Sequence, residues 1–186
     1  MKKFLIVGLG NIGDEYSGTR HNIGFEIIDS LISNFNGNFK DDKYGKLFKT
    51  NFSGKSLIFL KPNTFMNVSG KAVSYWAKKE KINLSNILII VDDLNLEFGI
   101  SRIRKSGTDG GHNGLKDIND KLNTTKYPRL RFGIGNNFKD GKQIDFVLQK
   151  WNDSENKNLS KLIEHNSSIV LHYIKHGIDN TMNTFN

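Results

Sequence analysis

The chain of 186 residues contains no cysteine, only two prolines and no long hydrophobic run. The absence of cysteine excludes disulfides, a thiolate metal site and a cysteine nucleophile. A transmembrane helix needs about 20 apolar residues in a row, and no segment approaches that length. The apolar run at residues 4–7 is too short for a secretion signal, because it breaks at once into glycines. We therefore predict one domain, residues 1–186, in the cytoplasm and without a membrane contact.

Positive charge is what the chain has in excess. It carries 27 Lys and Arg against 19 Asp and Glu, a formal net charge of +8. Such an excess favours polyanionic partners, with nucleic acid as the leading candidate. A basic surface that only keeps the protein in solution explains the charge equally well, so the charge alone decides little.

Apolar periodicity recurs along the whole length and predicts alternating strands and helices. Strands are expected at residues 4–9, 47–52, 56–61, 87–91, 100–104 and 129–135. Helices are expected at residues 23–35, closed by Gly37, around residues 72–77, and at residues 115–122 and 159–174. The strands on either side of Ser53-Gly54 should form a hairpin. This mixture indicates an α/β fold: a single domain with a mixed, twisted β-sheet surrounded by helices.

A glycine motif, G-x-G-x-x-G, occupies residues 8–13 directly after the first strand. A dinucleotide site would need a helix that begins within the glycines and holds pyrophosphate at its N-terminus. Here residues 14–20 intervene before the helical pattern begins, and Asp14 and Glu15 would repel a phosphate. We favour a sharp bend that points Asn11 into a cleft at the carboxyl edge of the sheet, where α/β proteins usually place their sites.

His21 and Asp92 are the candidates for acid–base chemistry. Asp92 ends an apolar strand, and His21 precedes a helix. A carboxylate bonded to one imidazole nitrogen fixes the tautomer and lets the other nitrogen take a proton from water. Local capping roles for both residues are at least as compatible with the spacing.

Three asparagines, Asn11, Asn67 and Asn113, stand where a strand or loop leads into a helix. An amide both donates and accepts hydrogen bonds, so it can hold a carbonyl and its attacking water. Each is equally typical of a helix cap or turn. His172 and His176 have the spacing of metal ligands, but no cysteine or carboxylate set accompanies them, and we predict no metal site.

Several sequence blocks follow one another over nearly the whole chain. They are Gly8-Leu9-Gly10-Asn11 with Gly13; Tyr16 with Thr19-Arg20-His21-Asn22; Lys61-Pro62 with Thr64-Phe65-Met66-Asn67 and Ser69-Gly70; Asp92-Asp93-Leu94; Gly110-Gly111-His112-Asn113-Gly114-Leu115-Lys116; and Arg129-Leu130-Arg131 with Gly133-Ile134-Gly135. Together, in this order, they resemble the bacterial peptidyl-tRNA hydrolase family.

The resemblance implies an α/β monomer without metal or other cofactor. Its partner would be the acceptor end of peptidyl-tRNA, and it would cleave the ester between peptide and tRNA, in translation and ribosome rescue. By this likeness His21 is the base that activates water, and Asp92 orients it. Asn11, Asn67 and Asn113 would position the last carbonyl of the peptide and the terminal ribose, with an amide stabilising the oxyanion.

The same likeness assigns residues that bind the two ends of the substrate. Phe65 and Met66 would line the cleft, and Tyr16 would contact the end of the substrate. Arg104 and Arg131 match positions at which the family grips tRNA phosphate.

Two departures from the family pattern and one rival function accompany this prediction. Ile12 stands where the family usually has proline, and Asp109 adds negative charge beside the expected RNA path. The rival is a non-catalytic RNA-binding factor on the same fold. Such a factor needs the basic residues, but it does not need His21, Asp92 and the three asparagines together.

Overall fold

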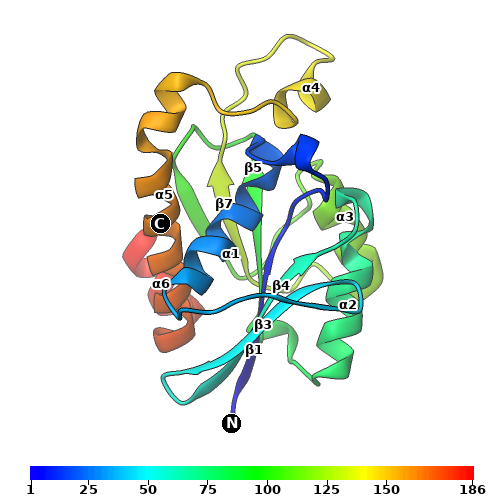
Figure 1. Cartoon of the computed structure of the whole chain (residues 1–186), viewed down its shortest axis with the longest axis vertical. Helices are drawn as coiled ribbons and strands as arrows, with labels where there is room; N and C mark the ends of the chain where they lie inside the picture. The colour runs from blue at the N-terminus through cyan, green and yellow to red at the C-terminus, as the bar shows by residue number, and fades with distance from the viewer.

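One twisted sheet of seven strands runs through the molecule, and the computed structural model describes all 186 residues around it (Figure 1). The strands are β1 (Lys3–Gly8), β2 (Lys40–Asp42), β3 (Gly45–Phe52), β4 (Lys55–Pro62), β5 (Ile87–Asp93), β6 (Ser101–Arg104) and β7 (Arg129–Gly133). Their order is β2-β3-β4-β1-β5-β7-β6. The central strands β4, β1, β5 and β7 are parallel, and the edge strands pair antiparallel. Parallel strands covered on both faces read as nearly continuous apolar runs, as β1 and β5 do.

Helices cover both faces of the sheet (Figure 1). They are α1 (Ile23–Ser33), α2 (Ser69–Lys79), α3 (Asn113–Leu122), α4 (Gln143–Val147), α5 (Asp153–His176) and α6 (Ile178–Phe185). One face carries α1 and α5, and the other carries α2 and α3. The short helix α6 packs against the edge strand β6. None of these helices combines the length and the apolar character that crossing a membrane requires.

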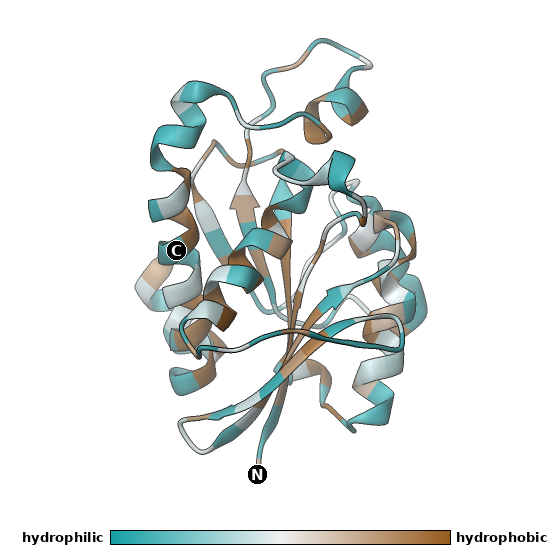
Figure 2. Ribbon diagram, viewed as in Figure 1, coloured by the Kyte–Doolittle hydropathy of each residue, from teal (hydrophilic) through white to brown (hydrophobic).

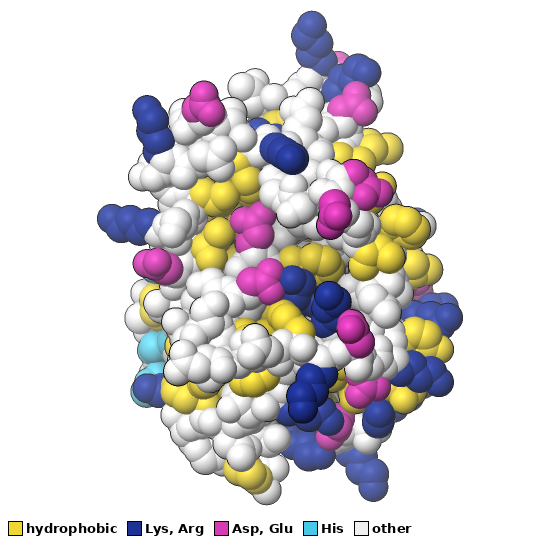
Figure 3. Space-filling model, in the orientation of Figure 1, with side chains coloured by type: hydrophobic (Ala, Val, Ile, Leu, Met, Phe, Trp, Pro, Cys, Tyr) yellow, Lys and Arg dark blue, Asp and Glu magenta, His cyan; other side chains and the backbone are white.

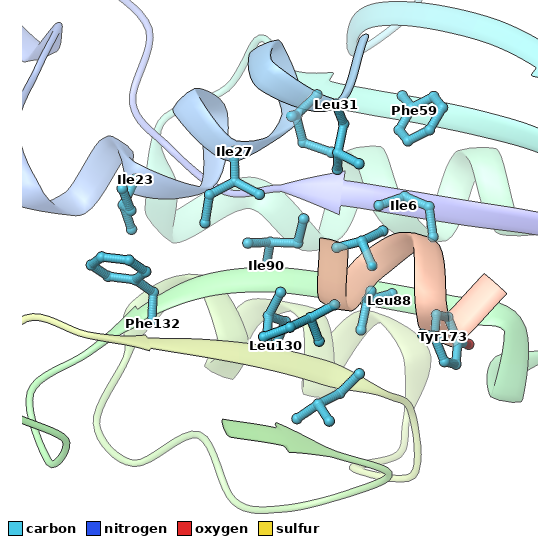
Figure 4. Packing of buried hydrophobic residues seen from close by; sticks show 14 of the residues in the cluster. Ile6, Ile23, Ile27, Leu31, Phe59, Leu88, Ile90, Leu130, Phe132 and Tyr173 are labelled. Carbon is cyan, nitrogen blue, oxygen red and sulfur yellow. The ribbon is translucent and has the colours of Figure 1, made fainter. Parts of the chain in front are cut away.

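The apolar core has two halves, one on each face of the sheet. Figure 4 shows the half under α1 and α5, where Ile27 faces Ile90 and Tyr173 lies beside Leu88. The other half lies under α2 and α3 and contains Trp76 and Leu115. Hydrophobic residues follow the strands and the helix faces turned toward the sheet (Figure 2). Because the core packs on both faces of the sheet, it fixes where each strand ends. The loops at the carboxyl edge begin at those strand ends, so their starting positions are fixed as well.

The predicted α/β fold is confirmed, and every predicted strand and helix is present within a few residues of its expected bounds. The hairpin turns at Ser53 and Gly54, both of which have positive φ, as the favoured two-residue turn requires. Strand β2 and helices α4 and α6 escaped prediction. Strand β2 and helix α4 are too short for a periodic pattern. Helix α6 has Ile178, Met182 and Phe185 at helical spacing, but it follows directly after Gly177, where the preceding helix was expected to end.

Gly37 closes α1 as predicted, because its N–H donates to the carbonyl of Ile32 at 3.2 Å. The residue that takes the left-handed conformation after α1 is Asn36, with φ 49°, and not Gly37. Gly37 is needed for space, because a side chain there would run into the ring of Phe48.

A close approach of backbones joins α1 to the centre of the sheet. A Cβ atom on Gly24 of α1 would lie 2.5 Å from the backbone of Leu9 and 2.7 Å from the carbonyl oxygen of Ile90. Gly8 faces the same contact from the strand side. The first turn of α1, and with it the segment that carries His21, can therefore lie directly on β1 and β5.

We predict that Gly24→Ala lowers the free energy of unfolding by roughly 3 kcal/mol, because the obstructing atoms are backbone and cannot rotate away. Chemical denaturation measures the loss. Gly107→Ala is the control: the nearest atom to its Cβ is the Arg129 Nη1, at 3.8 Å, so we expect little change or slight stabilisation. Equal unfolding free energies for the two variants would contradict the close-packing argument.

Candidate active site

A buried carboxylate lies at the carboxyl end of β5 and accepts hydrogen bonds from two imidazoles. Asp92 is 4% exposed. The Nδ1 of His21 lies 2.9 Å from each Asp92 oxygen, and the Nε2 of His112 lies 3.0 Å from Oδ1. His21 comes from the short turn Arg20–Asn22 that leads into α1, and His112 immediately precedes α3. The three side chains therefore meet from three separate parts of the chain.

The two histidines are held in different states. The Nδ1 of His112 accepts from the backbone N–H groups of Gly114 and Leu115, at 3.1 and 3.3 Å, and so caps α3. A nitrogen that accepts from two N–H groups carries no proton, so the single proton of His112 is on Nε2 and is donated to Asp92. Both ring nitrogens of His112 are thereby engaged, one by Asp92 and the other by the first turn of α3.

His21 is free to act as a base. Its Nδ1–H donates to Asp92, which leaves the lone pair of Nε2 available to accept a proton. Burial lowers the pKa of His21, but the charge of Asp92 and the hydrogen bond to it outweigh burial, and the net pKa lies above the ordinary 6.5. Burial by itself would raise the pKa of Asp92, but the two imidazoles lower it far below its usual range. Asp92 therefore stays ionised while His21 gains and loses a proton.

The same three residues have the composition of a two-histidine, one-carboxylate metal site, and their ligand atoms all lie within 4.8 Å of one another. A metal on the Nε2 of His112 would displace the proton there. That proton would have to move to Nδ1, where two backbone N–H groups already point. The arrangement is thus suited to proton transfer and unsuited to a metal ion.

Asn11 is held by backbone contacts that leave its amide nitrogen free. Asn22 accepts from the Asn11 backbone N–H through Oδ1 at 2.8 Å and donates to the Asn11 carbonyl through Nδ2 at 3.0 Å. The Oδ1 of Asn11 accepts from the backbone N–H of Met66 at 2.7 Å. With its oxygen so engaged, Asn11 presents Nδ2 as a donor for a ligand.

The glycine loop that carries Asn11 does not open a helix. After Gly13 comes the short turn Asp14–Tyr16, and α1 begins only at Ile23. A dinucleotide therefore has no helix N-terminus within the glycines, and the chain bends there instead; the role of Asn11 in the site stays a prediction.

Asn113 is the predicted amide that lines the cleft around His21. The cleft also contains Asp92 and His112, and α4 supplies Ile144 and Val147 to its wall. Asn11 instead lines a separate hollow of about 340 Å³. Met66 relates the two asparagines: its N–H donates to Asn11, and its sulfur lies beside Gly114, the residue after Asn113.

The remaining predicted substrate residues gather at the start of α2. Phe65 is 52% exposed and makes an edge-to-face contact with Tyr16, with ring centroids 6.4 Å apart. Met66 is buried between Asn11 and α3. Asn67 is exposed, and its side chain makes no hydrogen bond with the protein. Its amide is therefore available to a ligand, but its own position is less constrained than that of Asn11.

Arg104 and Arg131 line a separate pocket on β6 and β7 that adjoins the cleft and shares Asp93 with it. The Nε of Arg131 donates to Asp93 at 2.5 Å, so part of its charge is already neutralised. Beneath them Arg129, 1% exposed, donates to the carbonyl of Thr108 at 2.7 Å and holds the loop that borders the pocket.

Sequence reasoning missed three residues that organise the site: Arg20, Asn22 and His112. Arg20 is buried and donates to the carbonyl of Lys150 at 3.1 Å and to Glu155 at 2.7 Å, which ties the segment after α4 to the turn that carries His21. Arg20 and Asn22 lie directly before and after His21 in the sequence. This adjacency to a candidate base is the one sequence signal that points to them. His112 lies within a run of glycines, and this context gives no sequence signal that its side chain caps α3.

An ionised carboxylate, an oriented imidazole with a free nitrogen and fixed amide donors are the equipment of a hydrolase that activates water. A family model described as peptidyl-tRNA hydrolase matches residues 5–186. This chain therefore belongs to the peptidyl-tRNA hydrolase family, and the resemblance inferred from the sequence blocks is confirmed.

Relatives and solved structures agree with this membership. The peptidyl-tRNA hydrolase of Parabacteroides distasonis is 50% identical over 99% of this chain and 98% of that relative. That of Bacteroides fragilis is 53% identical over the same shares. The crystal structure of the peptidyl-tRNA hydrolase from Acinetobacter baumannii has a TM-score of 0.92 at 35% identity, covering 98% of this chain and 94% of that one. A Helicobacter pylori nucleosidase, with a TM-score of 0.54 at 11% identity, shares the fold alone.

We predict that Asp92→Asn moves the acidic limb of the pH–rate profile to lower pH. Catalysis needs neutral His21, so the wild-type rate rises with pH through the raised pKa of His21, above 6.5. Without the anion, burial alone acts on His21 and lowers its pKa. The maximal rate should also fall by about 10²-fold or more, because the imidazole loses its orientation.

Asp93→Asn is the matched control, since Asp93 is adjacent in sequence but pairs with Arg131 and not with His21. Its acidic limb should stay where the wild-type limb is. An unmoved limb in Asp92→Asn would show that Asp92 does not set the protonation of the base.

Proposed function

We propose that this chain hydrolyses the ester between a peptide and the 3′ end of tRNA, releasing the peptide and returning the tRNA to translation. The observation that carries the proposal is the Asp92–His21 pair with the free Nε2 of His21 facing a cleft. Membership of the peptidyl-tRNA hydrolase family supplies the substrate class. We place the protein in the cytoplasm as a monomer that takes part in ribosome rescue.

The reaction begins with a water that donates a proton to the Nε2 of His21 while its oxygen attacks the ester carbonyl. The positive charge that forms on His21 is stabilised by Asp92, which accepts from Nδ1. The Nδ2 of Asn11 donates to the developing oxyanion, and Asn113 orients the water. When the tetrahedral intermediate collapses, the ester C–O bond breaks and His21 returns its proton to the 3′ oxygen of the ribose.

Water is the nucleophile because the cleft offers no side chain for covalent attack. No serine, threonine or cysteine lines the cleft around His21. An ester of this kind needs only a positioned water, a base and an oxyanion donor.

The two ends of the substrate fall on different residues. Tyr16, Phe65 and Asn67 receive the part of the substrate next to the scissile ester, and the buried Met66 supports them by holding the side chain of Asn11. The aromatic ring of Phe65 is half exposed, so it can pack against an apolar or stacked group of the substrate.

Arg104 and Arg131 bind tRNA phosphate. They belong to a basic pocket beside the cleft, where the adjoining Arg129 is already engaged by backbone carbonyls. A guanidinium matches phosphate geometry through paired N–H groups, and Arg131 keeps its two terminal nitrogens free of the Asp93 contact.

A non-catalytic RNA-binding factor on this fold is not favoured. Such a protein gains nothing from a buried carboxylate that orients a free imidazole nitrogen. Maintaining Asp92 ionised inside the protein costs free energy that only the two imidazoles offset.

The decisive test is release of labelled peptide from an N-blocked aminoacyl-tRNA, run beside an aminoacyl-tRNA with a free amino group and without added metal. Cleavage of the blocked substrate alone is expected. His21→Ala should reduce kcat by about 10²–10⁴-fold because the base is lost. The affinity for tRNA should remain, because recognition lies elsewhere.

His165→Ala is the control for this substitution, because His165 is exposed on α5 and distant in sequence from the cleft residues. It should leave turnover unchanged. Normal tRNA binding by the wild type without cleavage would favour the RNA-binding factor, and unchanged turnover in His21→Ala would remove His21 from its role.

We further predict that Arg104→Ala and Arg131→Ala weaken tRNA binding and that each flattens the plot of log K against log salt by about 0.7–0.9, the value for one lost phosphate contact. Arg131→Ala should have the larger effect on affinity, because it also leaves Asp93 unpaired beside the RNA. Fluorescence anisotropy over a salt series measures both. Lys157→Ala on α5 is the control, and a salt slope equal to the wild type in both arginine variants would place the phosphates elsewhere.

A further inference from the structure

A second basic surface lies along α2, away from Arg104 and Arg131. We call it the α2 surface and define it by Lys43, Tyr44, Lys71, Tyr75 and Lys79. In Figure 3, lysine and arginine side chains gather with hydrophobic ones at the lower right, in the region that α2 occupies in Figure 1. The substrate residues already described do not include any of the five.

Two tyrosine rings form the centre of the α2 surface. Tyr44 and Tyr75 are partly exposed and pack edge to face, with centroids 5.3 Å apart. The ammonium of Lys71 lies 4.8 Å from the ring of Tyr44, and that of Lys43 lies 5.1 Å from the ring of Tyr75. Lys79 lies 5.5 Å from the ring of Tyr75. Flexible lysine side chains therefore cover these partly exposed rings, and a ligand that displaces a lysine head gains the ring face.

The three lysines have no carboxylate partner. The acidic residue closest in sequence to Lys79 is Glu80, and it is paired with Lys3 and Lys49 instead. Lys43, Lys71 and Lys79 take part in no salt bridge. Three like charges gathered around two aromatic rings repel one another, and a polyanion would relieve that repulsion.

The turn that holds Tyr44 is built in an unfavourable conformation. Lys43 and Tyr44 form the two-residue connection between β2 and β3, and Tyr44 has φ 64°. Glycine or asparagine normally takes such a position, and a bulky aromatic residue there is a genuine outlier. An outlier of this kind persists only when the surroundings impose it, and such outliers cluster at binding sites.

The surroundings do impose it. The indole N–H of Trp76 donates to the carbonyl of Lys43 at 2.8 Å, and the backbone N–H of Asn63 donates to the carbonyl of Tyr44 at 3.1 Å. Trp76 is itself fully buried in α2. The ring of Tyr44 is therefore presented on a rigid base and does not depend on a flexible loop.

The position of the α2 surface relates it to the cleft. Lys71 lies in the first turn of α2, directly after the Met66–Val68 turn, in which Met66 donates to the side chain of Asn11. From Lys71 to Lys79 the helix rises about 12 Å. Arg131 lies on β7, four strand spacings from β3, or about 19 Å across the sheet. The two basic surfaces therefore flank the cleft on opposite sides.

We propose that the α2 surface binds single-stranded RNA, with its three lysines on phosphates and an unpaired base stacked on Tyr44. Lysines that track a backbone and aromatic faces that take bases are how proteins bind single strands without reading sequence. The inference rests on the proposed function in one respect: the strand is the unpaired 3′ end of the tRNA substrate, leading into the cleft.

The test compares Lys43→Gln/Lys71→Gln/Lys79→Gln with a triple control of the same charge change, Lys150→Gln/Lys157→Gln/Lys161→Gln. The control lysines are exposed and form no salt bridge. Binding of a short unstructured single-stranded RNA is measured by anisotropy over a salt series. The α2 variant should bind roughly tenfold or more weakly, and its salt slope should be flatter by about 2, for three contacts at ~0.7 each. The control should shift both much less.

Tyr44→Asn tests the stacking separately. Asparagine tolerates the left-handed conformation, so the turn is retained while the ring is lost. RNA affinity should fall roughly tenfold. The same variant should keep the wild-type kcat on N-blocked aminoacyl-tRNA and show a raised KM, a split that a folding defect would not produce.

The outcomes separate the surface from the activity. If the two triple variants bind RNA equally, the α2 surface is overturned even where cleavage of blocked aminoacyl-tRNA is normal. If Tyr44→Asn binds RNA like the wild type, stacking on Tyr44 is overturned. If the α2 variants lose RNA but the wild type cleaves no blocked substrate, the surface stands and the proposed activity fails.

Discussion

The hydrogen bonds to the buried carboxylate of Asp92 are the interaction on which the site depends. A lone ionised carboxylate at 4% exposure is costly, and the two imidazole N–H donors make it tolerable. Those donors come from the approach to α1 and the approach to α3, so one carboxylate joins three elements of the fold. The close contact of Gly24 with the backbone of Leu9 sets how near α1 can come.

The two histidines show how backbone geometry assigns chemical roles. His112 gives its Nδ1 to the N-terminus of α3 and its Nε2–H to Asp92, so neither ring nitrogen is free. His21 gives only its Nδ1–H and keeps Nε2 free. Identical side chains around one carboxylate thus become a fixed support and a base, because only one of them faces unpaired backbone N–H groups.

Two basic surfaces lie on either side of this centre. Arg104 and Arg131 stand on the β6–β7 side, partly compensated by Asp93. The α2 surface stands on the β3 side without carboxylate partners. A chain with a net charge of +8 therefore concentrates positive charge in distinct places, and the cleft between them holds the single buried carboxylate. A long anionic substrate with one reactive ester fits this division.

The sequence by itself determined the α/β fold, the order of the main strands and helices, and the family. Apolar periodicity and local motifs such as Ser53-Gly54 depend only on residues that are close in the sequence, so the sequence alone predicts the structures they form. Only the tertiary structure decided that His112 shares the carboxylate with His21. Those hydrogen bonds span 20 and 71 residues, and their existence depends on where β5, α1 and α3 end in space. The same holds for Tyr44: its strained turn is imposed by Trp76, a partner 33 residues from the bonded Lys43 carbonyl, and no local propensity predicts it.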